Sequence, residues 1–207
     1  MEHRKLLQDL RALGNVQAPS RLVAGVLNQL DLGDRFASLD SPLGPVFVAW
    51  NRYGVSAVMK TATGEEFAAR FNERFHRPAR PAAELPPGVL RRREFDLRGV
   101  TEFERAVLFK ALEIPPGQVR TYGWIAAQIG HPAAVRAVGS ALRKNPVPVL
   151  IPCHRVVLSD GHIGNYALGG SHAKRAILAA EGLQSADIER LARYWRPGPP
   201  RPLTAQG

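Results

Sequence analysis

A proline-rich segment near the middle of the chain most constrains the fold, because it separates two stretches with different hydrophobic periods. Residues 77–93 hold four prolines and one glycine and are rich in arginine. Neither a long helix nor a central strand continues easily through such a segment, because proline lacks a backbone N–H. We therefore expect a linker that closes a first domain over residues 36–92, and a second domain over residues 93–185.

Short β-prone runs precede the linker, at residues 36–39, 46–50 and 55–59. The turn signals Ser41-Pro42-Leu43-Gly44 and Asn51-Arg52-Tyr53-Gly54 separate them, and this spacing predicts an antiparallel meander. Thr63-Gly64-Glu65-Glu66 has the pattern of a capping box, which predicts a helix from there to about Phe75.

Helical patterns follow the linker. Thr101-Glu102-Phe103-Glu104 is a second capping box, and the helix that it opens is expected to end before Pro115-Pro116-Gly117. Two more helices, at about 122–129 and 133–144, flank Gly130-His131-Pro132, the short turn of a helix-turn-helix. The predicted fold class is α/β of the α+β kind.

The two ends of the chain lie outside these domains. Residues 1–35 have leucines at helical spacing, which predict a helical extension with helices at 2–13 and 21–30, and nothing in them indicates a role. Residues 186–207 form a predicted tail, unstructured after Trp195, where four prolines follow.

The charge balance favours a polyanionic partner such as nucleic acid. Lysine and arginine number 28 against 18 acidic residues, a formal net charge of +10. Between residues 114 and 175 the only acid is Asp160, against seven cations, which are Arg120, Arg136, Arg143, Lys144, Arg155, Lys174 and Arg175. The alternative is a basic composition throughout, since residues 70–98 are basic as well.

Cysteine usage and hydropathy indicate the compartment. Cys153 is the only cysteine, so an intramolecular disulfide and a zinc site with several thiolates are both excluded. The N-terminus has no signal-peptide apolar region, and no stretch approaches the roughly 18 apolar residues of a membrane span. We predict a cytoplasmic protein that binds no membrane.

The cysteine and its neighbour suit nucleophilic chemistry. Cys153 and His154 lie in a run stiffened by Pro146, Pro148 and Pro152, and a nearby histidine raises the reactive thiolate fraction. Adjacent side chains diverge, so we expect a water between them. Glu181, on a helix expected to begin at Ser171, is a candidate to orient the imidazole. The alternative is a small buried cysteine beside a core histidine.

The segment Ile151-Pro152-Cys153-His154-Arg155-Val156 resembles the signature of methylated-DNA-protein-cysteine methyltransferases, the O-6-alkylguanine-DNA alkyltransferases. The resemblance covers about residues 41–183 and includes Pro115-Pro116-Gly117, Tyr122-Gly123, Arg136-Ala137-Val138-Gly139 and Asn145-Pro146. It implies a ribonuclease-H-like first domain and a mostly helical DNA-binding domain with a winged helix-turn-helix-like motif.

The family moves an alkyl group from O-6 of guanine, and from O-4 of thymine, in double-stranded DNA to its own cysteine. The product is a thioether that water does not hydrolyse, so each molecule of this suicide methyltransferase reacts once. The resemblance makes Cys153 the nucleophile, His154 the water-linked base and Glu181 its partner. Tyr122 becomes the donor to the leaving guanine, and Asn145 the hinge between the recognition helix and the active-site loop.

The resemblance also assigns the contacts with DNA. Arg136 is the finger that enters the base stack from the minor groove, and Ala134, Ala137 and Gly139 let its helix approach. Arg143 and Lys144 contact phosphate. The guanine pocket is assigned to Pro148, Val156 and Tyr166, although plain core packing also accounts for them. The loop after Tyr166 is one residue longer than is usual in the family.

The expected protein is a monomer without cofactor, and without the zinc that some family members carry. Two rivals stay open. A cysteine hydrolase would use the same Cys153, His154 and Glu181 repeatedly, but the adjacent Cys-His order and the lack of a glycine-rich oxyanion motif argue against it. A non-catalytic sensor of alkylated DNA is the other, although relatives that only sense lesions have tryptophan in place of the cysteine.

Overall fold

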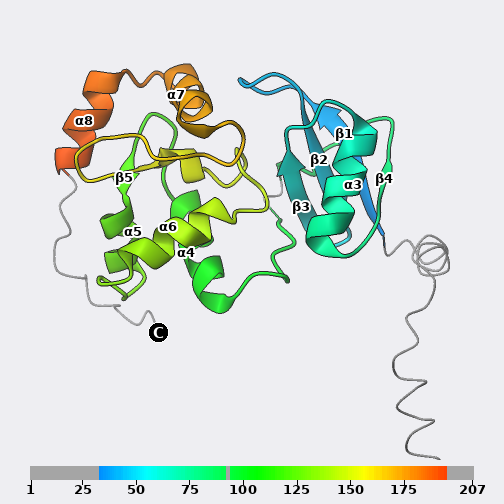
Figure 1. Ribbon diagram of the computed structural model, residues 1–207, viewed down its shortest axis with the longest axis horizontal. Coiled ribbons are helices and arrows are strands. Elements are labelled where there is room, and N and C mark those ends of the chain that lie inside the picture. The colour runs from blue at the N-terminus through cyan, green and yellow to red at the C-terminus, as the bar shows by residue number, and fades with distance from the viewer. Residues whose placement is uncertain (1–32, 92–93, 195–207) are drawn as a thin grey trace, which may run out of the picture. The chain divides into compact units, whose positions relative to one another are not determined.

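The computed structural model describes residues 33–91 and 94–194, and all of these from Asp34 onward belong to one unit. The helices predicted at 2–13 and 21–30, and the tail from Trp195, lie outside the described residues. The mixed α/β class is confirmed: a four-stranded sheet with helix α3 is followed by a mostly helical region (Figure 1).

The predicted meander is confirmed as strands β1 (Asp34–Leu39), β2 (Val46–Asn51) and β3 (Gly54–Met59), paired antiparallel. A fourth strand, β4 (Ala79–Pro81), runs parallel to β1, so the sheet order is β3-β2-β1-β4. The linker prediction was therefore wrong for residues 79–81. A proline is tolerated at the end of this edge strand, because no ladder hydrogen bond needs its missing N–H.

Helix α3 (Gly64–Phe75) packs across one face of this sheet (Figure 1). The Thr63 side chain accepts a hydrogen bond from the Glu66 N–H as predicted, but the Glu66 carboxylate accepts from Ala62 rather than Thr63, so the capping box is only half formed. Phe67 and Phe71 form the buried face of the helix. The ring centroid of Phe67 lies 4.7 Å from that of Phe36 on β1.

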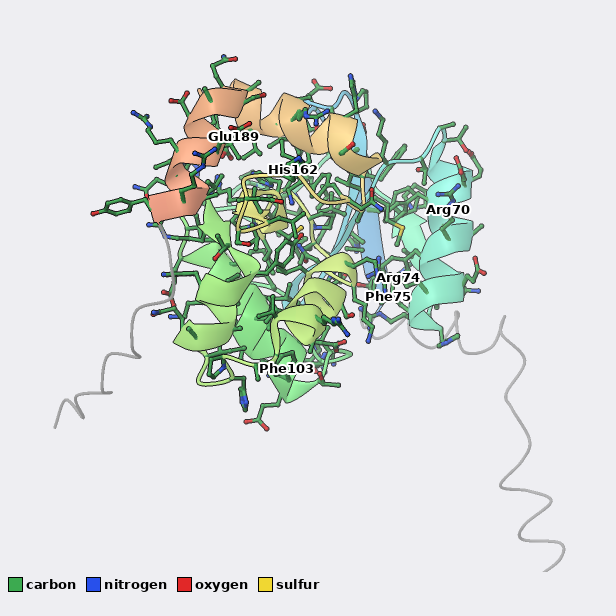
Figure 2. All side chains as sticks on the ribbon, turned by 60° about the vertical axis from the view of Figure 1, so that its left-hand side comes forward. Arg70, Arg74, Phe75, Phe103, His162 and Glu189 are labelled. Carbon is green, nitrogen blue, oxygen red and sulfur yellow. The ribbon has the colours of Figure 1, made fainter. Side chains whose placement is uncertain are left out.

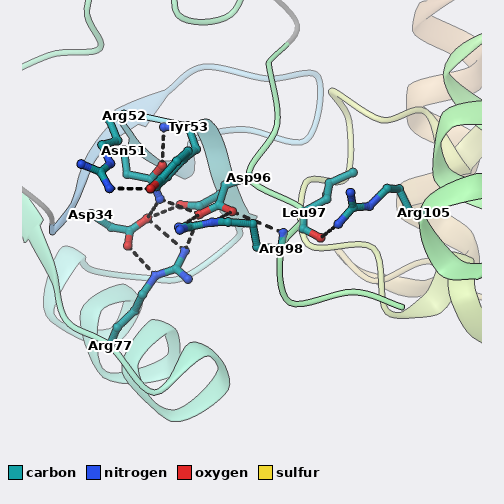
Figure 3. Close-up of polar contacts among 10 residues, drawn as sticks. Asp34, Asn51, Arg52, Tyr53, Arg77, Asp96, Leu97, Arg98 and Arg105 are labelled. Atoms are coloured by element: carbon teal, nitrogen blue, oxygen red, sulfur yellow. Dashed lines mark hydrogen bonds and ion pairs between the residues drawn. The ribbon is translucent and has the colours of Figure 1, made fainter. Parts of the chain in front are cut away.

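A buried polar cluster joins the sheet to the chain that leaves it (Figure 3). The Asp34 and Asp96 carboxylates are bridged by Arg77, at 2.6 Å and 3.1 Å, and Asn51 donates to both. Arg98 pairs with Asp96 at 2.7 Å. Burial alone would raise the pKa of Asp96, but hydrogen bonds from Arg98 and Asn51 hold it well below its usual range.

The helical region contains five α-helices among the described residues, and the second capping box, at Thr101 and Glu104, is fully formed. These helices are α4 (Glu102–Leu112), α5 (Tyr122–Gln128), α6 (Val135–Arg143), α7 (Gly170–Ala180) and α8 (Ser185–Tyr194). The predicted pair around Gly130 corresponds to α5 and α6.

Three elements here were not predicted. Strands β5 (Arg120–Thr121) and β6 (Val156–Val157) form a short parallel pair. Helix α8 occupies residues assigned to the tail, and its Ile188 and Ala192 are buried against Val157 and Leu178. Among residues 33–91 and 94–194, no helix is long and apolar enough to cross a membrane.

Candidate active site

A cavity of about 210 Å³ exposes one edge of the Cys153 side chain, which is 5% accessible. Cys153 begins a short 3₁₀ turn, Cys153–Arg155. Helix α6 and Tyr122 form part of the wall, and residues 165–167 form the rest. The single thiol of the chain therefore lies at the wall of a cavity beside helix α6.

The proline-stiffened run holds this thiol through backbone geometry. The Ile151 N–H donates to the Val147 carbonyl at 2.9 Å, and the Cys153 N–H donates to Ile151 at 2.8 Å. Val149 has φ of 74°, a left-handed conformation that β-branched residues rarely adopt. Such strain persists only where the surrounding structure over-determines it, as it does at functional loops.

Asn145 joins helix α6 to the thiol. Its fully buried amide donates from Nδ2 to the Ile151 carbonyl at 3.0 Å and to Cys153 Sγ at 3.2 Å, while its Oδ1 accepts from the Val147 N–H at 3.0 Å. Burial raises the pKa of the Cys153 thiol, and the Asn145 hydrogen bond opposes this rise. The direct hydrogen bond to sulfur was not predicted from the sequence.

His154 and Glu181 are in contact, as we predicted. His154 Nε2 lies 2.9 Å from Glu181 Oε1, and Arg155 donates to both oxygens of the same carboxylate, at 2.6 Å and 3.0 Å. Glu181 lies just after helix α7, which begins at Gly170 rather than Ser171. Within the described part of the chain, no hydrogen bond joins His154 directly to Cys153.

The protonation state of this pair follows from the contacts. Burial would raise the pKa of Glu181, but the hydrogen bonds from His154 and Arg155 lower it to about 2, so the carboxylate only accepts. Nε2 of His154 must therefore carry the proton. Burial lowers the pKa of His154, which leaves a neutral imidazole whose buried Nδ1 has no hydrogen-bond partner among the described residues. Nδ1 is therefore the unprotonated ring nitrogen, buried in the protein and able to accept a proton.

Two further ionisable side chains, those of Tyr122 and Lys174, interact with the thiol. Tyr122, the first residue of α5, lines the cavity, and burial raises the pKa of its hydroxyl. Lys174 is buried on the apolar face of α7, donates to the Val156 carbonyl at 2.5 Å and lies 5.8 Å from the Tyr122 ring centroid. Burial lowers the pKa of Lys174 to about 8. We assigned no site role to Lys174 from the sequence. Its position between Ala173 and Ile177 does place this lysine on the apolar face of the helix, which is a signal that it is buried.

The predicted DNA-contact residues separate into two groups. Arg136 and Ala137 lie on the exposed face of α6, and Arg143 is at the cavity mouth. Ala134, just before α6, and Gly139 are half-buried, and a Cβ at position 139 would lie 3.8 Å from the Tyr122 ring. Lys144 pairs with Glu104 at 2.7 Å, so its ammonium already has a counter-ion.

Only one of the three predicted pocket residues lines the cavity with Cys153. That residue is Tyr166, whereas Pro148 lines a neighbouring cavity and Val156 is buried in the core. In the loop after Tyr166, Leu168 is buried in the core. Within the described residues, no three His, Cys, Asp or Glu side chains are grouped to hold a metal ion.

Comparison with known proteins gives consistent matches. Residues 102–183 match the family model described as 6-O-methylguanine DNA methyltransferase, DNA binding domain. A methylated-DNA-protein-cysteine methyltransferase of Rattus norvegicus is 47% identical over 110 residues, 53% of this chain. One from Methanosarcina acetivorans is 38% identical over 155 residues, 71% of this chain and 97% of that protein. The chain spans about half or less of the rodent relatives, between 39% and 51% of their length.

A solved structure extends the likeness to the fold. The crystal structure of Mycobacterium tuberculosis OGT in complex with DNA is 31% identical, with a TM-score of 0.59, and the alignment covers 74% of this chain and 98% of that chain. This chain thus matches nearly the whole length of both the archaeal and the mycobacterial protein, and the residues matched by the family model include Cys153. The chain belongs to the methylated-DNA-protein-cysteine methyltransferase family.

Proposed function

We propose that this protein repairs DNA by transferring the alkyl group from O-6 of alkylated guanine to Cys153, once per molecule. The observation that carries the proposal is the single thiol, Cys153, at the wall of a cavity. The thiol is next in the chain to the His154–Glu181 pair, and helix α6, which exposes Arg136 and Arg143, forms part of the same cavity wall. O-4 of alkylated thymine presents the same alkyl-oxygen bond to the thiol and is included as a substrate.

The resting thiol is protonated, since burial raises its pKa, so the reaction requires a base. The acceptor is Nδ1 of His154, reached through one water, and the imidazolium that results is stabilised by the ionised Glu181. Asn145 and Lys174 also favour the thiolate, through a hydrogen bond and a positive charge respectively.

Attack then forms the sulfur-carbon bond and breaks the bond from the alkyl carbon to O-6. The electron pair of that bond goes to the guanine, which leaves as an anion unless a proton is supplied. Tyr122, on the cavity wall, is the donor, and Lys174 beside its ring favours the tyrosinate that forms. The thioether is stable to water, which distinguishes this reaction from that of a hydrolase with the same residues.

The alkylated oxygen is inside the duplex, so the nucleotide must be extruded, at a cost of roughly a few kcal/mol. We place helix α6 in the minor groove, with Arg136 filling the vacated stack and Ala134 and Ala137 allowing close approach. Arg143, at the cavity mouth, is assigned to a phosphate. Lys144 is assigned to a second phosphate, which it reaches by leaving Glu104.

Finer features of the architecture are part of the same proposal. The order β3-β2-β1-β4, with β4 parallel to β1, supports a ribonuclease-H-like first domain, and the β5-β6 pair beside α5 and α6 supports a winged helix-turn-helix. The division into domains at residues 36–92 and 93–185, the monomeric state, the cytoplasmic location and the pocket roles of Pro148 and Val156 stay predictions.

A titration tests single turnover. Duplex DNA carrying one labelled O-6-methylguanine is added in excess to a known amount of protein, and protein-bound label is measured against time. We expect the label to reach a plateau at one methyl group per protein molecule, and Cys153→Ser to take up none. Continued release of free methyl product would indicate a hydrolase, and lesion binding without transfer would indicate a sensor.

A further inference from the structure

Residues of the predicted first domain donate hydrogen bonds to the chain segment around Asn145. Arg74, near the end of α3, donates from Nη2 to the Lys144 carbonyl at 2.6 Å and approaches the Asn145 carbonyl at 3.5 Å. The Val58 N–H of β3 donates to the Pro146 carbonyl at 2.8 Å. Three consecutive carbonyls between α6 and the active-site loop are thus bound by residues from the sheet and its helix. Figure 2 shows Arg74 on α3, together with Arg70 of the same helix.

This position matters because it is the C-terminal end of the helix proposed to bind DNA. The last carbonyls of a helix lack intrahelical donors, and a cation there is favoured by the helix dipole. Lys144 is the C-cap of α6, and the residue after it, Asn145, reaches Cys153 Sγ with its side chain. The Arg74 guanidinium therefore binds the backbone of the residue whose amide contacts the reacting sulfur.

We infer that Arg74 is a positioning residue for alkyl transfer, holding the Asn145 backbone so that its amide stays on Cys153 Sγ. The inference deepens the proposed function, on which it rests. It gives the first domain a part in the reaction, although every side chain on the wall of the Cys153 cavity comes from the second domain.

The same helix offers a matched control. Arg70 lies one turn before Arg74 and lines the same neighbouring cavity, but it pairs with Glu66 at 2.7 Å and has no hydrogen bond to the hinge within the described residues. If the positive charge of α3 were what mattered, both arginines would contribute. If the contact with the hinge is what matters, only Arg74 contributes.

The thiol itself reports the effect, because Cys153 is the only cysteine and iodoacetamide labelling is then unambiguous. We would measure the labelling rate against pH for the full chain, Arg74→Ala, Arg74→Lys and Arg70→Ala, with Cys153→Ser as the blank. Lys174, Tyr122 and Tyr166 also interact electrostatically with the Cys153 thiol, and His154 follows it in the chain. All four are unchanged in these variants.

We expect Arg74→Ala to label about two- to tenfold more slowly at neutral pH, the range that one weakened hydrogen bond supports, with its midpoint at higher pH. Arg74→Lys should recover part of the rate, and Arg70→Ala should match the unmodified chain. A profile of Arg74→Ala that superimposes on the unmodified chain, even with a lower melting temperature, overturns the inference. Equal slowing in Arg70→Ala overturns it as well.

Methyl transfer from an O-6-methylguanine duplex is measured on the same four proteins. If the unmodified chain takes up no methyl group, the proposed function fails, while the labelling profiles still decide the role of Arg74. If methyl transfer occurs, we expect Arg74→Ala to lower the maximal rate at saturating DNA by the same factor. A changed half-saturating DNA concentration with an unchanged maximal rate would assign Arg74 to DNA binding instead and overturn the positioning role.

Discussion

Replacing Glu181 by glutamine tests the charge state on which the proposed proton transfer depends. The carboxylate binds His154 and Arg155, and its pKa falls from 4.5 to about 2 in spite of burial. A shift of this size corresponds to a contribution of up to about 3 kcal/mol to the free energy of unfolding. Glutamine keeps the size of the side chain and one acceptor oxygen but removes the charge.

The pH dependence follows from the direction of this shift. The folded-state pKa of Glu181 is below the unfolded one, so the unfolded chain binds more protons between about pH 2 and 4.5. The contribution is complete above the unfolded value and is lost as the pH falls toward 2. We therefore expect Glu181→Gln to be less stable by up to about 3 kcal/mol at pH 7, with the difference shrinking as the pH falls below 4.5.

Urea unfolding at pH 7, 5, 4 and 3 measures the difference. Glu113→Gln is the control, because the Glu113 carboxylate pairs with Lys110 on the surface and its side chain is 59% exposed. Such exposed pairs contribute roughly 0–1 kcal/mol. A Glu181→Gln difference that is the same at every pH, or no larger than that of the control, would refute the assignment of an ionised Glu181.

Three further predictions concern other parts of the protein. Arg136→Ala should raise the Kd for lesion-bearing duplex on the order of tenfold, measured by fluorescence anisotropy, and leave iodoacetamide labelling of Cys153 unchanged. Tyr122→Phe should slow methyl transfer at saturating DNA roughly 100-fold, the typical loss of one donor to a developing anion, and equal rates would remove Tyr122 as the proton source. Asp96→Asn should lower the free energy of unfolding at pH 7 by about 2 kcal/mol, since charged hydrogen bonds to Arg77 and Arg98 are lost. Because the pKa of Asp96 is lowered in the folded state, this difference should shrink as the pH falls below 3.8, where the unfolded chain takes up the proton, and urea unfolding at pH 7 and pH 3 measures the change.

Local signals in the sequence predicted most of the elements correctly. Thr101 and Glu104 are three residues apart, and their reciprocal hydrogen bonds form within one helical turn. The strands before the linker alternate with turn residues, of which Gly54 is required, because its φ is +119° and a Cβ there would lie 2.2 Å from the Glu94 carbonyl oxygen. Patterns of this kind involve only residues that are close together in the sequence, so the sequence alone is enough to predict them.

Features that depend on distant partners were not predicted. Strand β4 exists because Ala79 and Arg80 pair with the start of β1, more than 40 residues earlier. From the sequence alone Lys144 would be expected to be an unpaired surface cation, but in the structure its ammonium pairs with Glu104. Two of the seven cations counted in the basic stretch, Arg155 and Lys174, point inward, so the sequence overstates the charge on that surface.

The site was only partly predictable for a similar reason. Cys153, His154 and Glu181 follow from chemistry and resemblance, and the contact between His154 and Glu181 is present. Which loop residues face the cavity depends on the backbone at Val149, whose φ of 74° no propensity of a β-branched residue predicts. Pro148, the residue before Val149, lines the neighbouring cavity rather than the one that holds the thiol.

The most direct test of the account is mass spectrometry of the intact protein and of its peptides, after equimolar mixing with a duplex that bears one O-6-methylguanine. Cys153→Ser is the control. The account predicts one added methyl group on the peptide containing Cys153, with the guanine restored in the DNA. An unmodified protein that still binds the lesion, or a methyl group on any other residue, would contradict it.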